Sequence, residues 1–506
     1  MTKQLSTVTD ADGRVTTIVR VDADTVEIHA PPGPGANGES VVTTLDLDAN
    51  GYLSELTDPR GAKWAFDYAA DGLMTKAWDE RANEGGVRSG PPSTFTYETF
   101  GFDGNHERHY LVQDENALGG SQNLSWPTAP TLTQAPIYKT WCDGSQYIWS
   151  WVVTESRATV AWETAQGRTN TVEMVHSRTG PEPTDTSIRT EPSGRVTSST
   201  KGLSSFVHSG TAPGMTWDRE LTPDPRFGAE SAYPSASSTT VLAAEGRPAL
   251  TRTVVRGETA ILTEPLDPLS LAISTSNVTV NGTRTWNESY LDATKTFTSE
   301  SPEGRTSSYK VDAVGRVVQI NAPGQVPTQL VYDAEGYLLE VKRTKGAETR
   351  STRYTYDDRG YLGSVTADSS ATESLQTLLP QNDPMGFPGE VTVPGISTTL
   401  QSVDVAGATS GITPPGKPQH GMTYDVLGQL TEYRPPLHDA GAPAGTCPDG
   451  AECYSYSLDR QLEDVTLADG TVVDYSYGTA TGLLDSVVVP DFGTVNYGYT
   501  TAGRLQ

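Results

Sequence analysis

The sequence predicts an all-β fold built from consecutive antiparallel hairpins. In a recurring motif, an aromatic residue and an Asp or other polar residue precede a glycine, and a basic or aromatic residue and a branched aliphatic one follow it. Clear copies lie at Tyr332–Leu338, Tyr356–Leu362, Tyr424–Leu430 and Tyr499–Leu505. Gly315 and Gly336 are 21 residues apart, as are Gly51 and Gly72. A fixed period of this size indicates a repeat architecture.

Each part of the motif has a structural role. Tyr354 and Tyr356 are two residues apart, so both rings lie on one face of a strand. The stretch Arg316–Ile320 after the glycine is rich in β-branched residues, which favours a second strand. Between the strands, glycine supplies a positive φ and the Asp or Asn before it bonds the amides of the turn. One hairpin cannot bury its aromatic face alone, so neighbouring hairpins are expected to pair edge to edge.

Composition agrees with this prediction. The 506 residues include 49 Gly and 34 Pro, and only 35% are hydrophobic, which indicates many turns and modest apolar content per strand. A chain of this length exceeds the usual size of one hydrophobic core. We therefore expect a sheet that extends as a wall and does not fold into one compact core.

The hairpins resemble the RHS or YD-repeat proteins, named for the Tyr-Asp step quoted above. The resemblance extends to Thr222–Gly228, Val280–Thr283 and Thr298–Arg305, which are similar to degenerate repeats of that family. It implies a long antiparallel β-sheet of YD-repeat hairpins that spirals into a hollow shell or part of one. Bacterial RHS toxin shells, the Tc-toxin B/C cocoon and the teneurin YD shell are the members to which the likeness points.

The resemblance divides the chain into four stretches. We expect YD/RHS repeats over 1–80, a degenerate β region that forms a plug or distorted wall over 81–209, degenerate RHS repeats over 210–295, and YD/RHS repeats over 296–506. The stretch Thr9–Val15 already has the pattern of a repeat turn, so no signal peptide is expected in this chain. Because its last residues fall within a repeat, the chain is expected to be part of a longer protein or to need a second chain.

Charge and hydropathy exclude two classes of partner. The formal net charge is −27, from 36 basic and 63 acidic residues, and no basic track for phosphates is present. Nucleic-acid binding is therefore not expected. The longest apolar run, Tyr147–Val153, is far shorter than a membrane-spanning helix, so no membrane span is expected.

The cysteines leave two possibilities open. Cys447 and Cys453 are separated by five residues that include Pro448 and Gly450, a loop short enough for a disulfide, although two free thiols fit the sequence equally well. Cys142 has no partner in the sequence. A disulfide would place the protein outside a reducing cytosol, and the family resemblance likewise implies a secreted or cell-surface protein.

Two motifs resemble metal sites incompletely. Asp46–Gly51 matches the first half of a calcium loop, but Thr57 stands where that loop needs a bidentate Glu, so we predict a repeat turn. His106 and His109 are three residues apart, whereas the zinc-protease helix motif needs a spacing of four, and nearby glycines predict a loop. We expect no metal, no cofactor and no catalytic residue in this chain.

An aromatic cluster comprises Trp141, Tyr147, Trp149, Trp151 and Trp162. Trp149 and Trp151 would alternate onto one strand face, where exposed rings could stack against sugars. Packing within the wall, or a plug at one end of a shell, is the alternative that we favour, because large aromatic residues are more often buried than displayed.

Together these observations predict a non-catalytic RHS/YD-repeat shell that encloses and protects a cargo domain. By family resemblance that cargo is a toxin, encoded downstream or on a partner chain that closes the shell. The core-associated segment with which toxin-releasing members cut their own chain does not follow the last repeat, so no residue is assigned that role. The first alternative is a teneurin-like adhesion or glycan-binding module, and the second is an enzyme acting on an extracellular polymer.

Overall fold

The computed structural model describes residues 5–34, 38–101, 107–125, 131–140, 146–179, 183–202, 207–243, 248–368, 373–380, 382–393, 395, 397–436, 447–448, 450–500 and 505. Over these residues the chain forms one antiparallel sheet of 39 strands. Each strand pairs with the next one along the chain, except that β10 pairs with β12 and not with β11. The described residues contain two short 3₁₀ turns, η1 (Glu84–Gly86) and η2 (Asp292–Thr294), and no α-helix. The all-β prediction is confirmed.

The first stretch of the sheet consists of short strands. These are β1 (Thr7–Thr9), β2 (Val15–Arg20), β3 (Thr25–His29), β4 (Val42–Leu47), β5 (Leu53–Thr57), β6 (Lys63–Tyr68) and β7 (Met74–Trp78). Most of their residues are half-buried, and the fully buried apolar cluster consists of Ala65, Trp78 and Ala82. The wall is thus one sheet thick here, and its stability depends on backbone ladders and cross-strand contacts.

The connections between many short strands share one hydrogen-bonded turn. In the β4–β5 turn, the Asp48 carboxylate accepts the backbone N–H groups of Asn50 at 2.8 Å and Tyr52 at 2.9 Å. Gly51, with a φ of 85°, donates its N–H to the Asp48 carbonyl at 2.9 Å. The predicted positive φ of the glycine and the predicted bonding of the turn by Asp are both confirmed.

The same side-chain bond to the amide four residues ahead recurs along the chain. It is made by Asp10, Asp58, Asn116, Asp312, Asp333, Asp357, Asp383, Asp404 and Asp425. The bond satisfies turn amides that would otherwise face solvent and fixes the shape of each hairpin tip. Hairpin tips of equal shape can therefore be stacked.

The middle stretch has longer strands. These are β8 (Ser93–Gly101), β9 (Glu107–Glu115), β10 (Ser121–Ser125), β11 (Thr131–Thr140), β12 (Gln146–Thr164), β13 (Thr169–Ser177), β14 (Thr184–Thr190), β15 (Val196–Gly202), β16 (Val207–Ala212), β17 (Met215–Asp224), β18 (Gly228–Val241), β19 (Leu250–Leu262), β20 (Leu271–Val280) and β21 (Arg284–Leu291). The ladder is continuous across positions 80, 209 and 295, so the four stretches named above are consecutive parts of one sheet.

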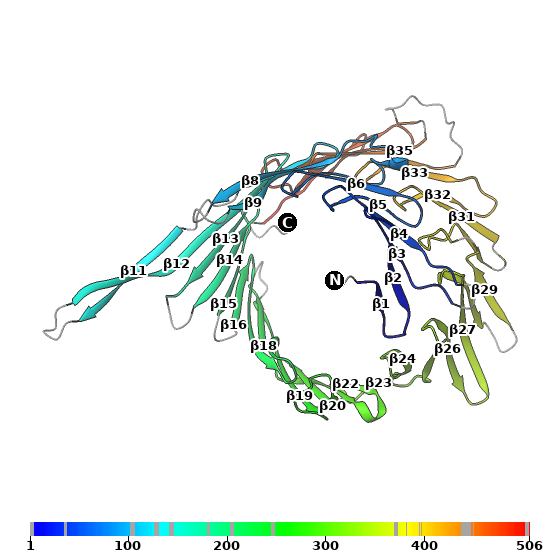
Figure 1. The fold of residues 1–506 in the computed structure, drawn as a ribbon, viewed down its shortest axis with the longest axis horizontal. Coiled ribbons are helices and arrows are strands. Elements are labelled where there is room, and N and C mark those ends of the chain that lie inside the picture. Colours follow the sequence, from blue (N-terminus) through cyan, green and yellow to red (C-terminus); the bar gives the residue numbers. More distant parts are fainter. Residues whose placement is uncertain are drawn as a thin grey trace.

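A two-stranded arm projects from this middle stretch (Figure 1). β12 pairs with β13 only from Glu155 to Glu163, and the preceding half of β12 pairs with β11 alone. β10 and β11 lie end to end along the same edge of β12. The arm therefore extends beyond the wall as a hairpin.

The last stretch returns to mostly short strands. These are β22 (Thr296–Glu300), β23 (Thr306–Val311), β24 (Val317–Asn321), β25 (Thr328–Tyr332), β26 (Leu338–Lys345), β27 (Glu348–Tyr356), β28 (Leu362–Asp368), β29 (Ser374–Leu378), β30 (Glu390–Val393), β31 (Ser397–Val403), β32 (Thr409–Thr413), β33 (His420–Tyr424), β34 (Leu430–Arg434), β35 (Glu452–Tyr456), β36 (Leu462–Thr466), β37 (Val472–Tyr477), β38 (Leu484–Val489) and β39 (Gly493–Asn496).

The tyrosine that directly precedes a turn, where Asp, Ser or Thr follows it, fastens neighbouring strands in this last stretch. Each such hydroxyl donates to a carbonyl at the start of the adjacent strand, at 2.9 Å. The pairs are Tyr332 with Val317, Tyr356 with Leu338, Tyr424 with Thr409, Tyr456 with Leu430, and Tyr499 with Leu484. Burial raises the pKa of Tyr332, Tyr356 and Tyr456. These hydroxyls therefore stay protonated and can donate well above neutral pH.

Replacing Tyr356 by Phe should remove one such bond. We expect a loss of about 1 kcal/mol at neutral pH, the typical net value of a hydrogen bond in a folded protein. Because burial raises the folded-state pKa, the contribution is complete below about pH 10, the ordinary tyrosine value, and is lost as the pH rises through the folded-state value. Denaturant unfolding of both proteins between pH 7 and 11 tests this. A stability difference that stays constant across that range would contradict the assigned role of the hydroxyl.

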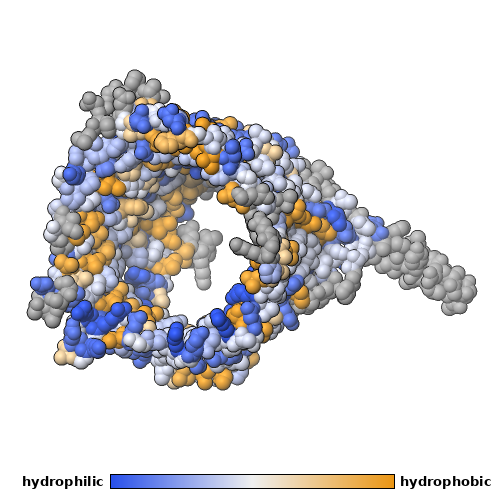
Figure 2. Space-filling view, turned by 180° about the vertical axis from the view of Figure 1, so that it is seen from behind, coloured by the Kyte–Doolittle hydropathy of each residue, from blue (hydrophilic) through white to orange (hydrophobic). Residues whose placement is uncertain are grey.

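The sheet winds around a central opening (Figure 1). It does not close into a barrel, and β24–β39 begin a second circuit that runs alongside β1–β13 of the first. Seen from behind, the space-filling view is hollow at the centre, with hydrophobic and hydrophilic residues interspersed over the wall (Figure 2). The expected spiralling sheet is confirmed.

Candidate functional site: the seam between two circuits of the sheet

The two circuits of the sheet meet along their hairpin tips. We call this line of contact the seam. Its first-circuit residues are Asp12, Gly33, Arg60, Arg81, Gly120 and Arg168, and the residues that they approach are Arg316, Asp358, Phe387, Asp404, Leu458 and Asp459. All of them lie in or next to the turns between strands, and the partners are about 300 positions apart in the sequence. The strand ladder pairs segments that are mostly close in sequence, and the seam adds contacts between segments that are far apart in sequence.

The most buried ion pair of the seam joins Arg168 and Asp459. Arg168 Nη1 lies 3.0 Å from Asp459 Oδ2, and each side chain is only 8% exposed. Arg168 also donates to Gln461 Oε1 at 2.5 Å and to the Thr479 carbonyl at 3.3 Å. One arginine of the β12–β13 turn thus holds the β35–β36 and β37–β38 turns together.

The Asp459 carboxylate is in turn fully engaged by the first circuit. It accepts the Thr164 hydroxyl at 2.7 Å and the Gln166 backbone N–H at 3.3 Å, in addition to Arg168. A buried carboxylate needs such partners, because an unpaired buried charge is strongly destabilising.

A second group of contacts is formed by arginines that face both an acid and an aromatic ring. Arg81 Nε lies 3.0 Å from Asp404 Oδ2, and its guanidinium lies 5.9 Å from the centre of the Tyr424 ring. Arg60 is held by Asp58 at 3.0 Å and lies 5.8 Å from the centre of the Phe387 ring. Cation–π contact of this kind stabilises arginine where water is partly excluded.

The start of the chain is fastened to the second circuit in the same way. Asp12 Oδ1 lies 3.0 Å from Arg316 Nη1, which links the β1–β2 turn to the β23–β24 turn. The Arg14 guanidinium lies 5.6 Å from the centre of the Tyr337 ring. Arg316 is also held by Asp312 of its own turn at 2.7 Å. The hairpin that contains the first described strand is therefore held against the second circuit.

One contact of the seam is made by backbone alone. The Glu39 N–H donates to the Asp358 carbonyl at 2.5 Å, although Glu39 belongs to the β3–β4 connection and Asp358 to the β27–β28 turn. Gly33 is buried in the same place, and a Cβ there would come closer than 3.0 Å to the backbone of Asp358 and Gly360. Glycine is thus needed for close approach of the two circuits.

The chemistry that the seam displays is recognition between hairpin tips. Asp12, Asp404 and Asp459 each pair with an arginine of the other circuit. Within the described ranges, no group of three or more His, Cys, Asp or Glu residues is placed to hold a metal ion. Its geometry joins the edges of the two circuits and keeps the wall continuous.

The structure assigns the calcium-like segment to a turn. Asp48 bonds the amides described above, and the Asp46 carboxylate accepts the Thr25 hydroxyl at 3.0 Å. Strands β4 and β5 flank the segment, as the repeat-turn prediction requires. His109 lies in β9, where its Nδ1 is 3.0 Å from the Thr99 hydroxyl, whereas His106 lies outside the described residues.

The aromatic cluster is mainly located on the projecting arm. Tyr147, Trp149 and Trp151 belong to the half of β12 that pairs with β11, and Trp162 lies further on, opposite Asn170 of β13. Trp141 lies outside the described residues, as do the side chains of Trp149 and Trp151. Sugar stacking and aromatic packing therefore both stay predictions. The Arg189 guanidinium covers the Trp162 ring at 5.7 Å, so this member of the cluster packs against the wall.

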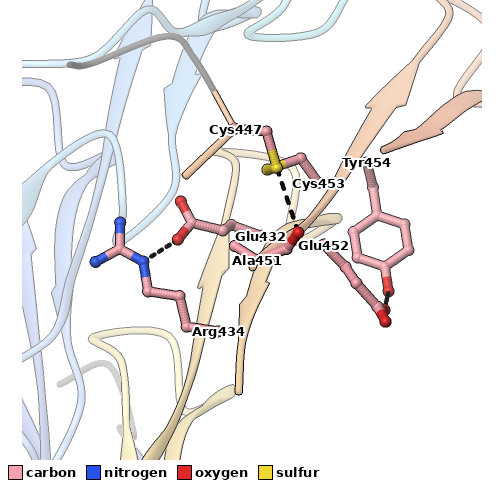
Figure 3. Close-up of a disulfide and its surroundings, with 7 residues drawn as sticks. All are labelled: Glu432, Arg434, Cys447, Ala451, Glu452, Cys453 and Tyr454. Atoms are coloured by element: carbon pink, nitrogen blue, oxygen red, sulfur yellow. Dashed lines mark hydrogen bonds and ion pairs between the residues drawn. A yellow bond between two sulfur atoms is a disulfide. The ribbon is translucent and has the colours of Figure 1, made fainter. Parts of the chain in front are cut away.

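Cys447 and Cys453 form a disulfide, which settles the choice left open by the sequence (Figure 3). Their Cα atoms are 5.7 Å apart, within the usual range for such a bridge. Cys447 precedes β35 and Cys453 lies within it. The ion pair of Glu432 with Arg434 lies next to the bridge. Burial and the bond to Glu452 raise the pKa of Tyr454 in this strand to about 12. The bridge thus fastens the end of a long connection to the wall.

Comparison with known proteins gives structural matches alone. No family model and no curated protein matches the chain. The solved TcdB2–TccC3 structure has 12% identity and a TM-score of 0.32, over 98% of this chain and 32% of that one. A TcdB2–TccC3–TEV structure has 13% identity and a TM-score of 0.32, over 99% and 31%.

The Tc holotoxin pore of Photorhabdus luminescens has 12% identity and a TM-score of 0.27, over 98% of this chain and 27% of that one. The chain thus spans about a third of the length of the chains that it matches. No described helix has the length and hydrophobicity needed to cross a membrane.

Proposed function

We propose that this chain is a section of a hollow β-shell whose wall encloses and protects a polypeptide cargo. The observation that carries the proposal is one uninterrupted sheet wound around a central opening, with two circuits joined along the seam (Figures 1 and 2). We further propose that the cargo is a toxin domain, encoded downstream or on a partner chain. The role is mechanical, and the chain itself is not an enzyme.

The physical basis is the exclusion of large molecules by a continuous ladder. Neighbouring strands in a sheet lie about 4.8 Å apart, so a protease cannot pass between them. The seam closes the remaining gap between circuits with buried pairs such as Arg168 with Asp459. A cargo kept inside such a wall would be separated from proteases and from the producing cell.

The disulfide adds a proposal about where the shell works. A bridge between Cys447 and Cys453 persists in oxidising environments and is rare in a reducing cytosol. We propose that the protein is secreted or displayed at the cell surface.

Electron cryo-microscopy of the full natural polypeptide, isolated with its partners from the extracellular and surface fractions of the producing cells, tests these proposals together. We expect density for another polypeptide within the opening, and resistance of that polypeptide to added protease. Cleavage of the wall should be confined to connections such as 435–445, which largely lie outside the described residues. An opening that is empty in every assembly, or rapid digestion throughout the strands, would overturn encapsulation. Recovery from the cytosol alone, with free thiols, would overturn the localisation.

A further inference from the structure

A groove of about 450 Å³ lies over strands β19–β24, and none of the seam residues lines it. Its end is formed by the tip of the β17–β18 hairpin, which leaves the regular ladder at two bulges between Glu220 and Asp224. The Tyr233 hydroxyl accepts the Glu258 N–H at 3.2 Å, and the Arg256 guanidinium lies 5.7 Å from the Tyr233 ring centre. These contacts hold the hairpin tip over the sheet.

One side of the groove is apolar. Tyr290, Phe297, Tyr309 and Ile320 stand directly opposite one another on four successive strands, so all four lie on one face. The ring centres of Tyr290 and Phe297 are 4.4 Å apart, and those of Phe297 and Tyr309 are 4.7 Å apart. Tyr290 is buried, whereas Tyr309 is 40% exposed and Ile320, at the end of the row, is 43% exposed. The result is a rigid hydrophobic ridge with an accessible ring.

Beside this ridge runs a row of polar side chains. Ser276, Glu288, Ser299 and Ser307 are opposite one another on β20–β23, two residues along from the aromatic row, and therefore face the same side. Within the described part of the chain, none of these four side chains has a hydrogen-bond partner, and the Ser276 hydroxyl is buried without one. Elsewhere in the sheet, facing hydroxyls such as Thr240 and Thr251 bond each other at 2.9 Å.

Unpaired hydroxyls and a carboxylate beside an apolar ridge have the donors and acceptors that a sugar requires. We propose that this groove binds a neutral oligosaccharide. Its volume lies within the range of small-ligand sites, and the combination of an apolar surface with a few polar groups is typical of them. The Glu288 carboxylate and the serine hydroxyls would bond sugar hydroxyls, while Phe297 and Tyr309 would cover the apolar C–H surface of the sugar ring.

Charge and backbone pairing argue against other ligands. The charged residues that line the groove are three acids, Asp224, Glu258 and Glu288, against two arginines, Arg226 and Arg256, and Arg256 is paired with Glu258. The net charge of the lining is therefore negative, which disfavours an anionic ligand. An extended peptide usually binds a sheet by adding a strand at a free edge. The backbone groups of β20–β23 face paired strands on both sides, so they offer no such edge.

Titration of the full chain tests the proposal. The probes are neutral oligosaccharides of two to four units, a uronic-acid oligosaccharide and an uncharged pentapeptide, measured by calorimetry and saturation-transfer NMR. We expect binding of a neutral oligosaccharide alone. Glu288→Gln and Ser299→Ala should each weaken it about tenfold, since a lost hydrogen bond to a buried or charged partner has that effect. Tyr309→Ala should weaken it to a similar extent.

Neither of the matched control residues lines the groove. Glu335→Gln alters a carboxylate in the exposed β25–β26 turn, and Phe492→Ala removes a ring that is 91% exposed, so neither should change affinity. Circular dichroism and melting curves identify any variant that fails to fold. If the other variants fail to fold, the affinity of Ser299→Ala, which is the smallest change, tests the proposal. Absence of binding by every neutral sugar, preferential binding of the acidic sugar or the peptide, or equal loss in the controls would overturn the proposal. Because these measurements need no cargo, failure here is distinguishable from failure of the shell proposal.

Discussion

Replacing Arg168 by Met should open the seam at its most buried contact and destabilise the second circuit by about 3–5 kcal/mol, the usual effect of removing one partner of a buried ion pair. Asp459 would keep the Thr164 hydroxyl and the Gln166 amide but lose its only described cationic partner. Methionine retains much of the apolar stem of arginine, so loss of packing is kept small. The missing charge is then the main change.

The measurement is amide hydrogen exchange, because a protein of this size does not guarantee two-state unfolding. We expect faster exchange at the Gln166 amide and in the turns around Asp459 and Thr479, while first-circuit strands such as β4 and β5 stay protected. In a repeat ladder each unit depends on its neighbours, so opening at the seam is local before it is global. Unchanged exchange at Gln166 would show that the seam does not hold the circuits together.

Two variants separate the buried charge from other effects. Arg157→Met removes an arginine that is paired with Glu155 and Glu173 but whose side chain is 46% exposed, so the seam amides should keep their protection. The double variant Arg168→Met with Asp459→Asn removes both charges and should recover part of the lost protection, because a buried neutral pair costs less than a buried unpaired charge. A double variant as labile as Arg168→Met alone would point to lost packing as the cause.

The sequence predicts the hairpin well because its determinants are local. The Asp and Gly of a turn such as Asp48–Gly51 are three positions apart, and the tyrosine precedes the turn Asp directly, as in Tyr356–Asp357. A turn that bonds its own amides is decided within five residues. The strands, the glycine conformation and the all-β class all follow from that unit.

The seam could not be predicted because its partners are fixed by the pitch of the spiral. Whether Arg168 meets Asp459 or another acid depends on how many strands complete one circuit, and therefore on twist accumulated over the whole sheet. The only local signal of the seam was the basic residue next to the turn glycine, as in Arg14 and Arg316. This signal does not indicate which residue of the other circuit is its partner. The groove was missed for a similar reason. Pro223 and Pro225 mark a break in the ladder near the bulges between Glu220 and Asp224, but they do not say over which strands the hairpin tip then lies.

The middle stretch shows where the repeat signal failed. β12 extends from Gln146 to Thr164 without a single Gly or Pro, whereas the regular stretches place a turn glycine after most short strands. Because no Gly or Pro interrupts β12, the strand is longer than β13, and the part that β13 does not cover forms the arm with β11. The aromatic cluster was found from the sequence, but its position on a projecting hairpin depends on that length mismatch.

Gly33→Ala should separate the two circuits at a second position of the seam, next to its Asp12–Arg316 end, by adding one carbon atom. The new Cβ would come closer than 3.0 Å to the backbone of Asp358 and Gly360, and backbone cannot move aside as a flexible side chain can. We expect a loss of about 1–3 kcal/mol, typical of forced overpacking. The specific readout is the Glu39 amide, which donates to the Asp358 carbonyl and should exchange faster once the β27–β28 turn is displaced.

Gly257→Ala is the matched control for this substitution. Gly257 lies in β19, does not have a positive φ, and has nothing within 4 Å of the position that a Cβ would occupy. It should be tolerated, because alanine restricts the unfolded chain more than glycine does and meets no obstacle here. If Gly33→Ala leaves Glu39 as protected as in the unaltered chain, the close approach of the two circuits is not a stable contact. If Gly33→Ala and Arg168→Met each increase exchange only at neighbouring contacts of the seam, these contacts act independently, and closure of the wall is the sum of separate hairpin-tip contacts.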